Sequence, residues 1–216
     1  MLLQAPVHLA AVARAAQHTG RSIAGLSGPW DQVVAAREAL NLQGRPSLKN
    51  SREDLYALDL RDLVVPPLLT EAGIHCRHPL RNELDLLTEW RVGFAIEALG
   101  EQEGPALWES CRQDVGLHHR RGSDWLLIHD KTPASYGTFN AMLPDIVQIG
   151  GVWTPPTLRG RGYGRSVVAG SLLSASRQGV ARAVLFADPR NPPAGRAYVA
   201  LGFRRTGDFG LMLLAH

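Results

Sequence analysis

Apolar residues beyond residue 80 recur in patterns that predict alternating helices and strands. Helical spacing predicts four helices, over residues 82–99, 105–118, 163–178 and 192–201. Strand-like runs stand at residues 125–129, 134–142, 146–154, 183–187 and 203–214, the last of them a strand or a hairpin. The run at 183–187 is uniformly apolar, which is typical of a central strand covered on both faces.

The first 76 residues mix short helical and extended pieces. Residues 31–42 have the pattern of a helix. Ser51 followed by Asp54 indicates a capping box, so we predict a second helix over residues 53–63. Residues 75–79 form a short strand or connector. We therefore predict an α/β segment of undefined role at residues 1–76 and a second domain at residues 77–216.

Composition limits the classes of function. The chain has 216 residues, 45% of them hydrophobic, with a formal net charge of +3. This charge is too small to predict a nucleic-acid partner, and no apolar run reaches the length of a membrane span. Cys76 and Cys111 form no CxxC pair, and the N-terminus has no signal-peptide pattern, which together favour a cytoplasmic protein. The clusters His75-Cys76-x-His78 and His118-His119 lack zinc-site spacing, so we predict no metal.

The strongest chemical signal is a glycine-rich loop between a predicted strand and a predicted helix. It reads Arg159-Gly160-Arg161-Gly162-Tyr163-Gly164. Glycines let the backbone turn sharply and leave amide hydrogens exposed, and the start of the next helix carries partial positive charge. Arg159, Arg161 and Arg165 add full charges. The loop is therefore predicted to bind an anion such as a pyrophosphate.

A dinucleotide-binding loop is the first interpretation. Gly160 and Gly162 match the opening of G-x-G-x-x-G, and Asp188 follows the next strand. Against it, Arg165 stands at the third glycine position, and about fifty residues follow, too few for the rest of a doubly wound sheet. A Walker loop is excluded because no G-K-[ST] is present.

The second interpretation takes the C-terminal segment as a whole. Arg159-x-x-Gly162-x-Gly164, a helix, an apolar strand, then Asn191, Tyr198 and Gly202-Phe203 resemble the two motifs of the GNAT superfamily, the GCN5-related N-acetyltransferases. The resemblance covers residues 77–216. The variant at residues 149–163 is similar to a bacterial subgroup of predicted acetyltransferases with an extra N-terminal α/β segment. The implied fold is α/β (α+β), with a mixed, mostly antiparallel central sheet that is splayed at the cofactor site and covered by helices on both faces.

The resemblance implies acetyl-CoA as co-substrate and a primary amine, on a small molecule or a peptide, as acceptor. The backbone of Val152 and Thr154 would pair with the pantetheine arm, and the Val152 amide would donate to the developing oxyanion. The residues implied in cofactor binding are Val152, Trp153, Thr154, Arg159, Gly160, Arg161, Gly162, Tyr163, Gly164, Arg165, Asn191 and Ala194. A homodimer is a further implication.

Tyr198 is the implied catalytic residue. A phenol with a pKa of about 10 can donate a proton or a hydrogen bond to a departing thiolate, whose conjugate acid has a pKa of about 8.5. From the helix alone, Tyr198 reads as an ordinary packed side chain. Cys76 and Cys111 lie outside the donor motifs, which favours direct attack in a ternary complex over an acyl-enzyme.

The general base stays open at the sequence level. Its candidates are Glu83, Glu89, Glu97, Asp145 and Asp188. Two other functions remain as alternatives: a non-catalytic CoA-binding or interaction module, and a dinucleotide-dependent oxidoreductase. The sequence does not identify the acceptor.

Overall fold

The computed structural model describes Met1 and residues 4–215, and the chain forms two compact units. The smaller unit comprises Met1–Leu55, Phe186–Asn191 and Arg205–His216. The larger comprises Tyr56–Leu185 and Pro192–Arg204. Both units are therefore discontinuous in sequence. The domain boundary predicted between residues 76 and 77 stays a prediction.

The sheet of the larger unit has the strand order β2-β7-β6-β5-β4-β3. Neighbours from β3 to β6 pair antiparallel, and β6 pairs with β7 in parallel. The strands are β2 (Ser47–Asp59, its last part), β3 (Ile74–Arg77), β4 (Asp124–His129), β5 (Thr132–Met142), β6 (Ile146–Trp153) and β7 (Arg182–Ala187). This mixed, mostly antiparallel sheet confirms the predicted fold class.

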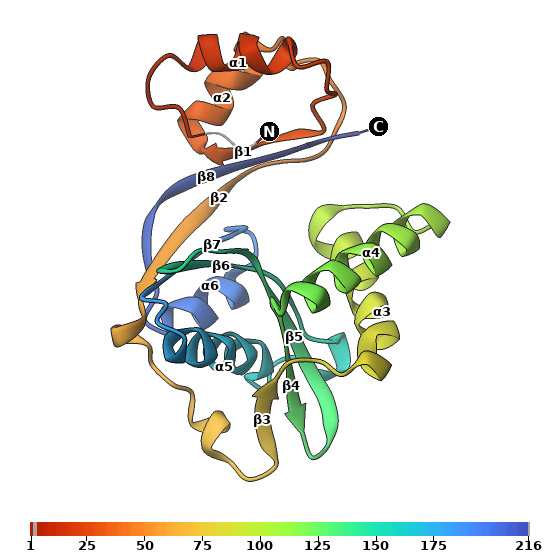
Figure 1. The fold of residues 1–216 in the computed structure, drawn as a ribbon, viewed down its shortest axis with the longest axis vertical. Helices are drawn as coiled ribbons and strands as arrows, with labels where there is room; N and C mark the ends of the chain where they lie inside the picture. Colours follow the sequence, from red (N-terminus) through yellow and green to blue (C-terminus); the bar gives the residue numbers. More distant parts are fainter. Residues whose placement is uncertain (2–3, 216) are drawn as a thin grey trace. The chain divides into compact units, whose positions relative to one another are not determined.

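Helices cover both faces of this sheet (Figure 1). Helix α5 (Tyr163–Arg177) packs on β3 to β6 from one side, and α3 (Leu84–Phe94) and α4 (Pro105–Arg121) pack on β6 and β4 from the other. A π-helical turn, Ala95–Leu99, extends α3 up to Gly100. The short helix α6 (Pro192–Val199) contacts α5.

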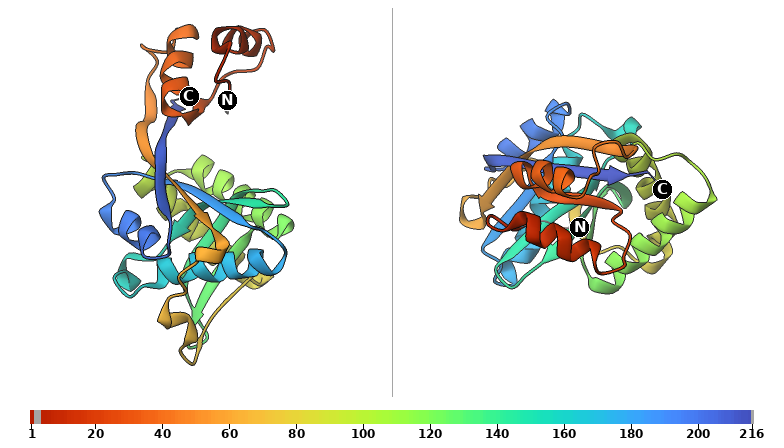
Figure 2. Two further views of the ribbon diagram at one scale, coloured as in Figure 1. Left: turned by 90° about the vertical axis from the view of Figure 1, so that its left-hand side faces the viewer. Right: turned by 90° about the horizontal axis from the view of Figure 1, so that it is seen from above.

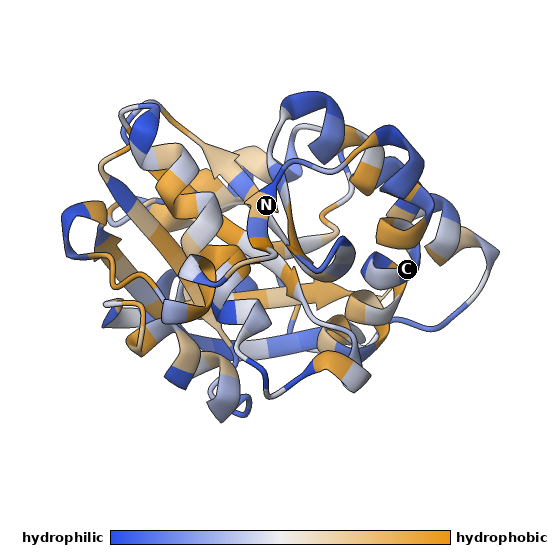
Figure 3. Cartoon of the chain, turned by 90° about the horizontal axis from the view of Figure 1, so that it is seen from below, coloured by the Kyte–Doolittle hydropathy of each residue, from blue (hydrophilic) through white to orange (hydrophobic). Residues whose placement is uncertain are grey.

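The core of the larger unit follows the pattern of apolar positions. Figure 3 shows apolar colouring along many of the strands and on parts of the helices. One cluster joins α3, α4 and the sheet, and it consists of Leu87, Val115, Leu126, Ile128 and Tyr136. On the opposite face, α5 buries Val167, Val168 and Leu172. Burial of these side chains fixes the two helix layers against the strands.

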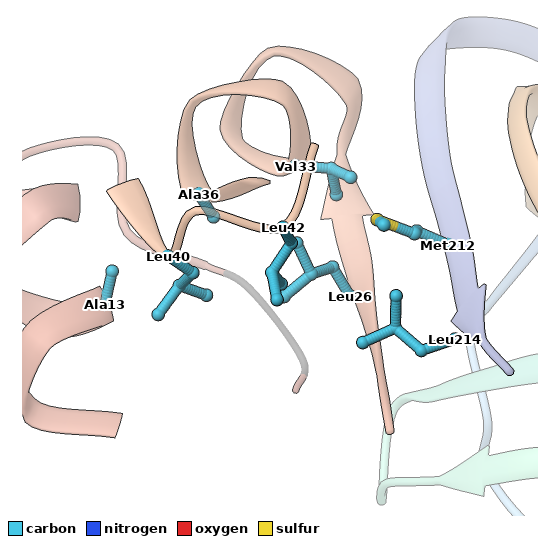
Figure 4. Close-up of a cluster of buried hydrophobic side chains, with 8 residues drawn as sticks. All are labelled: Ala13, Leu26, Val33, Ala36, Leu40, Leu42, Met212 and Leu214. Atoms are coloured by element: carbon cyan, nitrogen blue, oxygen red, sulfur yellow. The ribbon is translucent and has the colours of Figure 1, made fainter. Parts of the chain in front are cut away.

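The smaller unit has its own core. It contains α1 (Leu9–Gln17), α2 (Trp30–Ala39) and strands in the order β1-β8-β2, with β1 at Gly25–Pro29 and β8 at Arg204–Leu214. Helices α1 and α2 pack against each other (Figure 2). An apolar cluster lies between these helices and the strands (Figure 4): Ala13, Leu26, Val33, Ala36, Leu40, Leu42, Met212 and Leu214. This unit therefore buries apolar surface independently of the larger one.

The helix predicted over residues 53–63 is wrong. These residues continue β2 up to Asp59 and end in a 3-10 turn, Leu60–Asp62. The Ser51 hydroxyl donates to the Glu53 carboxylate at 2.5 Å, so it caps no helix. Ion pairs to β8, Arg205 with Asp54 at 2.6 Å and Arg52 with Asp208, hold the segment in the sheet. Tertiary pairing thus overrides the local capping signal.

The other predicted elements are confirmed within a few residues. The segment after Phe203 is one strand, β8, and not a hairpin. Helix α1 and strand β1 had no counterpart in the prediction, and the helix predicted over residues 82–99 ends in a π-helical turn. Gly100 does end its helix, in the left-handed conformation with φ 75°.

Candidate active site

The end of β6 carries a bulge. The β5–β6 register pairs Thr138 with Gly150 and Tyr136 with Trp153, so two residues of β6, Gly151 and Val152, lie opposite Gly137. Gly151 has φ 57°, a conformation that glycine adopts at little cost. A bulge re-aims the backbone of one strand relative to its neighbour. Here it changes the direction of β6 one residue before the strand ends.

Strand β6 also separates from β7. The parallel register runs from Ile146 opposite Arg182 to Gln148 opposite Val184 and ends there, although β6 continues to Trp153. This is the arrangement predicted from the resemblance. The side chain of Val152 points to the α5 face, since it lies 4.0 Å from the position of a Cβ on Gly164.

The glycine loop connects β6 to α5 and presents a series of backbone amides. Gly160 and Gly162 have φ 78° and 81°, and Gly162 is the N-terminal cap of α5. Within the described part of the chain, no group accepts a hydrogen bond from the six amides of residues 160–165. Ser166 is the first residue to donate, to the Gly162 carbonyl at 3.0 Å. Six unbonded amides at the positive end of a helix can surround an anion.

Gly164 brings this loop against the end of β6. A Cβ at this position would stand 3.3 Å from the Thr154 hydroxyl oxygen. That hydroxyl shares a hydrogen bond of 2.9 Å with Ser135 on β5, and Ser135 also donates to the Trp153 carbonyl at 3.0 Å. The Thr154 side chain is therefore held by the sheet, and its predicted cofactor contact is through the backbone.

Arg159 is the most constrained arginine of the loop. Its two terminal nitrogens donate to the Glu97 carboxylate at 2.9 and 3.0 Å, and its Nε donates to the Thr154 carbonyl at 3.0 Å. Its guanidinium carbon also lies 4.7 Å from the centre of the Trp153 ring. Trp153 in turn packs on α3, with ring atom Cζ2 2.9 Å from where a Cβ on Gly93 would be. Arg159 thus links the loop to the π-helical turn that carries Glu97.

The other two arginines are available to an anion. Arg161 is exposed and, in the described part of the chain, makes no ion pair or hydrogen bond through its side chain. Arg165 stands in the first turn of α5 with its Nε buried and without a hydrogen-bond partner among the described residues. A buried donor without an acceptor is costly, so this nitrogen is poised to gain one.

The side chain of Tyr163 packs against the sheet, whereas its backbone amide lies in the glycine loop. The ring is buried, and its hydroxyl lies 2.5 Å from Nδ1 of His129 on β4. The two rings meet edge to face with centres 5.5 Å apart. This contact fixes the first residue of α5 to the sheet. The predicted contribution of Tyr163 to anion binding therefore comes from its amide.

Tyr198 lies on α6 and is half-buried between two aromatic rings. The ring centres of Tyr56 and Phe203 are 6.3 and 6.0 Å away. Burial raises the pKa of Tyr198 to about 12. The phenol therefore stays protonated at neutral pH and keeps a proton that it can donate in a hydrogen bond. Ala194, one turn earlier on α6, is half-buried, and Asn191 is an exposed residue of the smaller unit whose amide donates to the Asp188 carbonyl at 2.8 Å.

Most candidate bases are already paired with arginines. Glu83 bonds to Arg77 at 2.7 and 2.8 Å, which lowers its pKa. Arg182 lowers the pKa of Asp145 and Arg190 lowers that of Asp188. Glu97 is bound to Arg159. Glu89 is exposed and, among the described residues, has no partner.

A buried polar cluster beside α4 was missed at the sequence level. Asp124 is 0% exposed, and neither of its carboxylate oxygens has a hydrogen-bond partner in the described part of the chain. Nδ1 of His78 and of His119 lie 3.8 and 3.7 Å from these oxygens. Burial raises the pKa of the Asp124 carboxyl, and the two imidazoles oppose this rise. The paired histidines at 118–119 hinted at it, but only the fold brings His78 to the same carboxylate.

Neither a metal site nor a membrane span is found in the part of the chain that the structure describes. No group of three or more His, Cys, Asp or Glu side chains there is placed to hold a metal ion. No described helix is both long and apolar enough to cross a bilayer.

Comparison with known proteins identifies the family. The sequence model of the acetyltransferase (GNAT) family matches residues 84–203, more than half of the chain. None of the curated proteins compared with the chain matches it.

Solved structures share the fold at low sequence identity. A GCN5-related N-acetyltransferase from Kribbella flavida aligns with a TM-score of 0.63 and 19% identity, covering 100% of this chain and 78% of that one. A functionally unknown conserved protein from Staphylococcus epidermidis aligns at 0.63 and 15% identity, covering 94% and 77%. A GNAT acetyltransferase from Colwellia psychrerythraea aligns at 0.59 and 15% identity, covering 96% and 71%.

The family match covers the β6 bulge, the glycine loop and Tyr198, and the similar structures have the same arrangement of sheet and helices. The chain belongs to the acetyltransferase (GNAT) family.

Proposed function

We propose that this protein transfers an acetyl group from acetyl-CoA to a primary amine by direct attack in a ternary complex. The observation that carries the proposal is the series of six unbonded amides at residues 160–165, which runs from the glycine loop into the first turn of α5. The exposed Arg161 and the unpartnered Nε of Arg165 add positive charge to the same loop. Together they suit the diphosphate of coenzyme A.

The remaining groups supply the chemistry of the transfer. The divergence of β6 from β7 leaves backbone groups of β6 for the pantetheine arm, and the Val152 amide at the bulge is proposed as the oxyanion donor. Tyr198 is proposed to donate to the departing thiolate. Its pKa of about 12 exceeds that of a thiol, so the phenol acts by hydrogen bonding more than by complete proton transfer.

Direct attack is favoured by the state of the two cysteines. Burial raises the pKa of Cys76 to about 12 and also raises that of Cys111. A thiol is nucleophilic only as thiolate, so neither cysteine suits an acyl-enzyme at neutral pH. We also propose a cytoplasmic location. A homodimer and the contacts of Asn191 and Ala194 with the cofactor remain proposals from the resemblance.

A thiol-release assay with a panel of primary amines tests the proposal. The wild-type protein is compared with Arg161→Glu and with Arg21→Glu, an exposed arginine of the smaller unit that serves as control. We expect amine-dependent release of CoA and a KM for acetyl-CoA about 10-fold higher in Arg161→Glu, because a phosphate contact becomes repulsive. Binding of acetyl-CoA without thiol release from any amine would instead indicate a non-catalytic module.

The melting temperature of the protein with CoA or with NAD distinguishes the acetyltransferase from a dinucleotide-dependent oxidoreductase. A ligand that binds only the folded protein raises its melting temperature by mass action. We expect a shift with CoA and none with NAD at equal concentration. The reverse result would reject the acetyltransferase proposal.

A further inference from the structure

The face of β6 opposite α5 has no side chains at the bulge. Gly150 and Gly151 leave their backbone uncovered by any Cβ. Polar groups of neighbouring elements occupy the space above them. A Cβ on Gly151 would lie 2.9 Å from the Thr138 hydroxyl oxygen and 3.7 Å from Nη1 of Arg91, and the Asn140 amide fills the position of a Cβ on Gly150.

Helices α3 and α4 pack on this face of the sheet. Arg91 lies on α3, with its side chain 23% exposed. Its Nη2 donates to Asp114 of α4 at 3.1 Å, and its guanidinium carbon lies 5.1 Å from the centre of the Phe94 ring. No described group accepts a hydrogen bond from Nη1. The free edge of this guanidinium is therefore the one nearest to Gly151.

A second donor on the same face lacks a partner. Tyr136 precedes Thr138 by two residues on β5, so both side chains point to the same side of the sheet. Its ring packs with Leu87 of α3 and Val115 of α4, and it is 1% exposed. The hydroxyl is buried and has no hydrogen-bond partner among the described residues. Nη1 of Arg91 and the Tyr136 hydroxyl are thus two donors on this face that have no acceptor among the described residues.

We infer that Arg91 recognises a carboxylate on the acceptor amine. The inference rests on the proposed acetyl transfer. The amine nitrogen must reach the thioester near Val152, and Gly151, the adjacent residue of the bulge, faces Nη1 of Arg91. An anionic oxygen there gains the unbonded Nη1–H as a charge-assisted hydrogen bond.

The charge of the pair selects the class of anion. Asp114 already compensates one positive charge, so Arg91 and Asp114 together are neutral. A monoanionic carboxylate suits this pair better than a dianionic phosphate. The second negative charge of the phosphate would be repelled by the Asp114 carboxylate and would have no cation of the pair to balance it. The acceptor class is therefore an amine that also carries a carboxylate, as in an amino acid.

Matched amines test this assignment. Thiol release is measured with β-alanine against propylamine and with phenylalanine against phenethylamine, using wild type, Arg91→Gln, Arg91→Lys and Asp114→Asn. We expect wild-type kcat/KM to favour the carboxylate member of each pair by about 10-fold or more. Arg91→Gln should lower kcat/KM for the carboxylate amines by about 10- to 100-fold and leave the neutral amines nearly unchanged.

Asp114→Asn distinguishes two roles of Arg91: binding of the acceptor carboxylate, and a structural ion pair with Asp114 that joins α3 to α4. If Arg91 binds the carboxylate, loss of the competing Asp114 charge should keep or increase the preference for carboxylate amines. If the pair is only a brace, Arg91→Gln and Asp114→Asn should lower the turnover of all amines alike. That result, or a wild type without preference, overturns the inference while acetyl transfer itself stands.

Failure of the proposed function gives a different result, namely no thiol release with any amine. Saturation-transfer NMR then decides the inference. N-acetyl-β-alanine and N-propylacetamide are compared on wild type and Arg91→Gln in the presence of CoA. We expect only the carboxylate compound to bind, and only to wild type; equal signals from both compounds would overturn the inference.

Discussion

Arg159, the first residue of the loop motif, is bound by protein groups in the structure. Its contacts to Glu97, Thr154 and Trp153 leave fewer of its N–H groups for a phosphate than the sequence suggests. The Glu97 pair is solvent-exposed, with side chains 41% and 54% accessible. Exposed pairs contribute about 0–1 kcal/mol, so a diphosphate can compete for this guanidinium.

Glu97→Gln should therefore tighten the binding of acetyl-CoA. The substitution removes one negative charge beside Arg159, and we expect the Kd to fall by about 2- to 5-fold, more at low salt. Titration calorimetry at two salt concentrations measures the change. Glu109→Gln, which removes a carboxylate paired with Arg112 on α4, is the control. Weaker binding in Glu97→Gln would show that Glu97 positions Arg159 and does not compete for it.

Tyr198→Phe tests the proposed donor. The variant keeps the aromatic ring between Tyr56 and Phe203 and loses only the hydroxyl. We expect kcat to fall by about 100-fold or more, with the Kd for acetyl-CoA unchanged. Because burial raises the Tyr198 pKa to about 12, wild-type kcat should show no loss from its ionisation below pH 10. Unchanged kcat in the variant would contradict the role of Tyr198.

Asp124 should make stability depend on pH. Burial raises its pKa in the folded protein above the unfolded value of about 3.9. Between these two values the folded state binds more protons than the unfolded state, so stability falls as pH rises through this window and remains lower above it. Asp124→Asn removes this penalty, and its stability relative to wild type should increase from pH 4 to pH 7.

Chemical denaturation across this pH range is the measurement. Asp85→Asn, at an exposed carboxylate of α3, is the matched control and should follow the wild-type profile. His78 and His119 are present in all three proteins, so their effect on the other groups is shared. A profile for Asp124→Asn parallel to wild type would contradict the assignment of a penalised carboxylate.

At the scale of elements, Gly93 lets α3 approach the Trp153 ring of β6 closely. A Cβ on Gly93 would stand 2.9 Å from the Trp153 ring, whereas a Cβ on Gly116 of α4 would meet only the terminal Nη1 of Arg120 at 3.2 Å. Gly93→Ala should therefore destabilise the protein by about 1–3 kcal/mol. Gly116→Ala, the same substitution in a helix, should stabilise it by about 0.5–1 kcal/mol.

Thermal or urea unfolding of the two variants tests this contrast. Displacement of Trp153 should also disturb Arg159, so Gly93→Ala is expected to weaken acetyl-CoA binding while Gly116→Ala leaves it unchanged. Equal effects of both alanines on stability would mean that α3 does not depend on close approach to β6.

Elements with local signals could be predicted from the sequence. Glycine caps and apolar periodicity located α3, α4 and α5, and the loop motif predicted an anion site that stays a prediction. The helix predicted over residues 53–63 failed because its strand state depends on partners in β8, about 150 residues later, such as Arg205 with Asp54. Likewise, nothing local connects Arg159 with Glu97, or His78 with Asp124. These contacts are products of the fold.

At the scale of the molecule, the larger unit brings β6, the glycine loop and α6 together from separate parts of the sequence. The loop follows β6 after the 3-10 turn Pro156–Leu158, and α6 packs on α5, whose first turn holds the unbonded amides of residues 163–165. The predicted anion site and the phenol of Tyr198 thus lie in the same unit. We expect the diphosphate of coenzyme A to bind the amides of residues 160–165.

A crystal structure of the complex with acetyl-CoA tests that claim most directly. We predict that diphosphate oxygens lie within about 3.2 Å of amide nitrogens in residues 160–165. The thioester sulfur should lie within hydrogen-bonding reach of the Tyr198 hydroxyl. Electron density for the diphosphate at any other part of the chain, or a sulfur beyond the reach of Tyr198, would contradict the account.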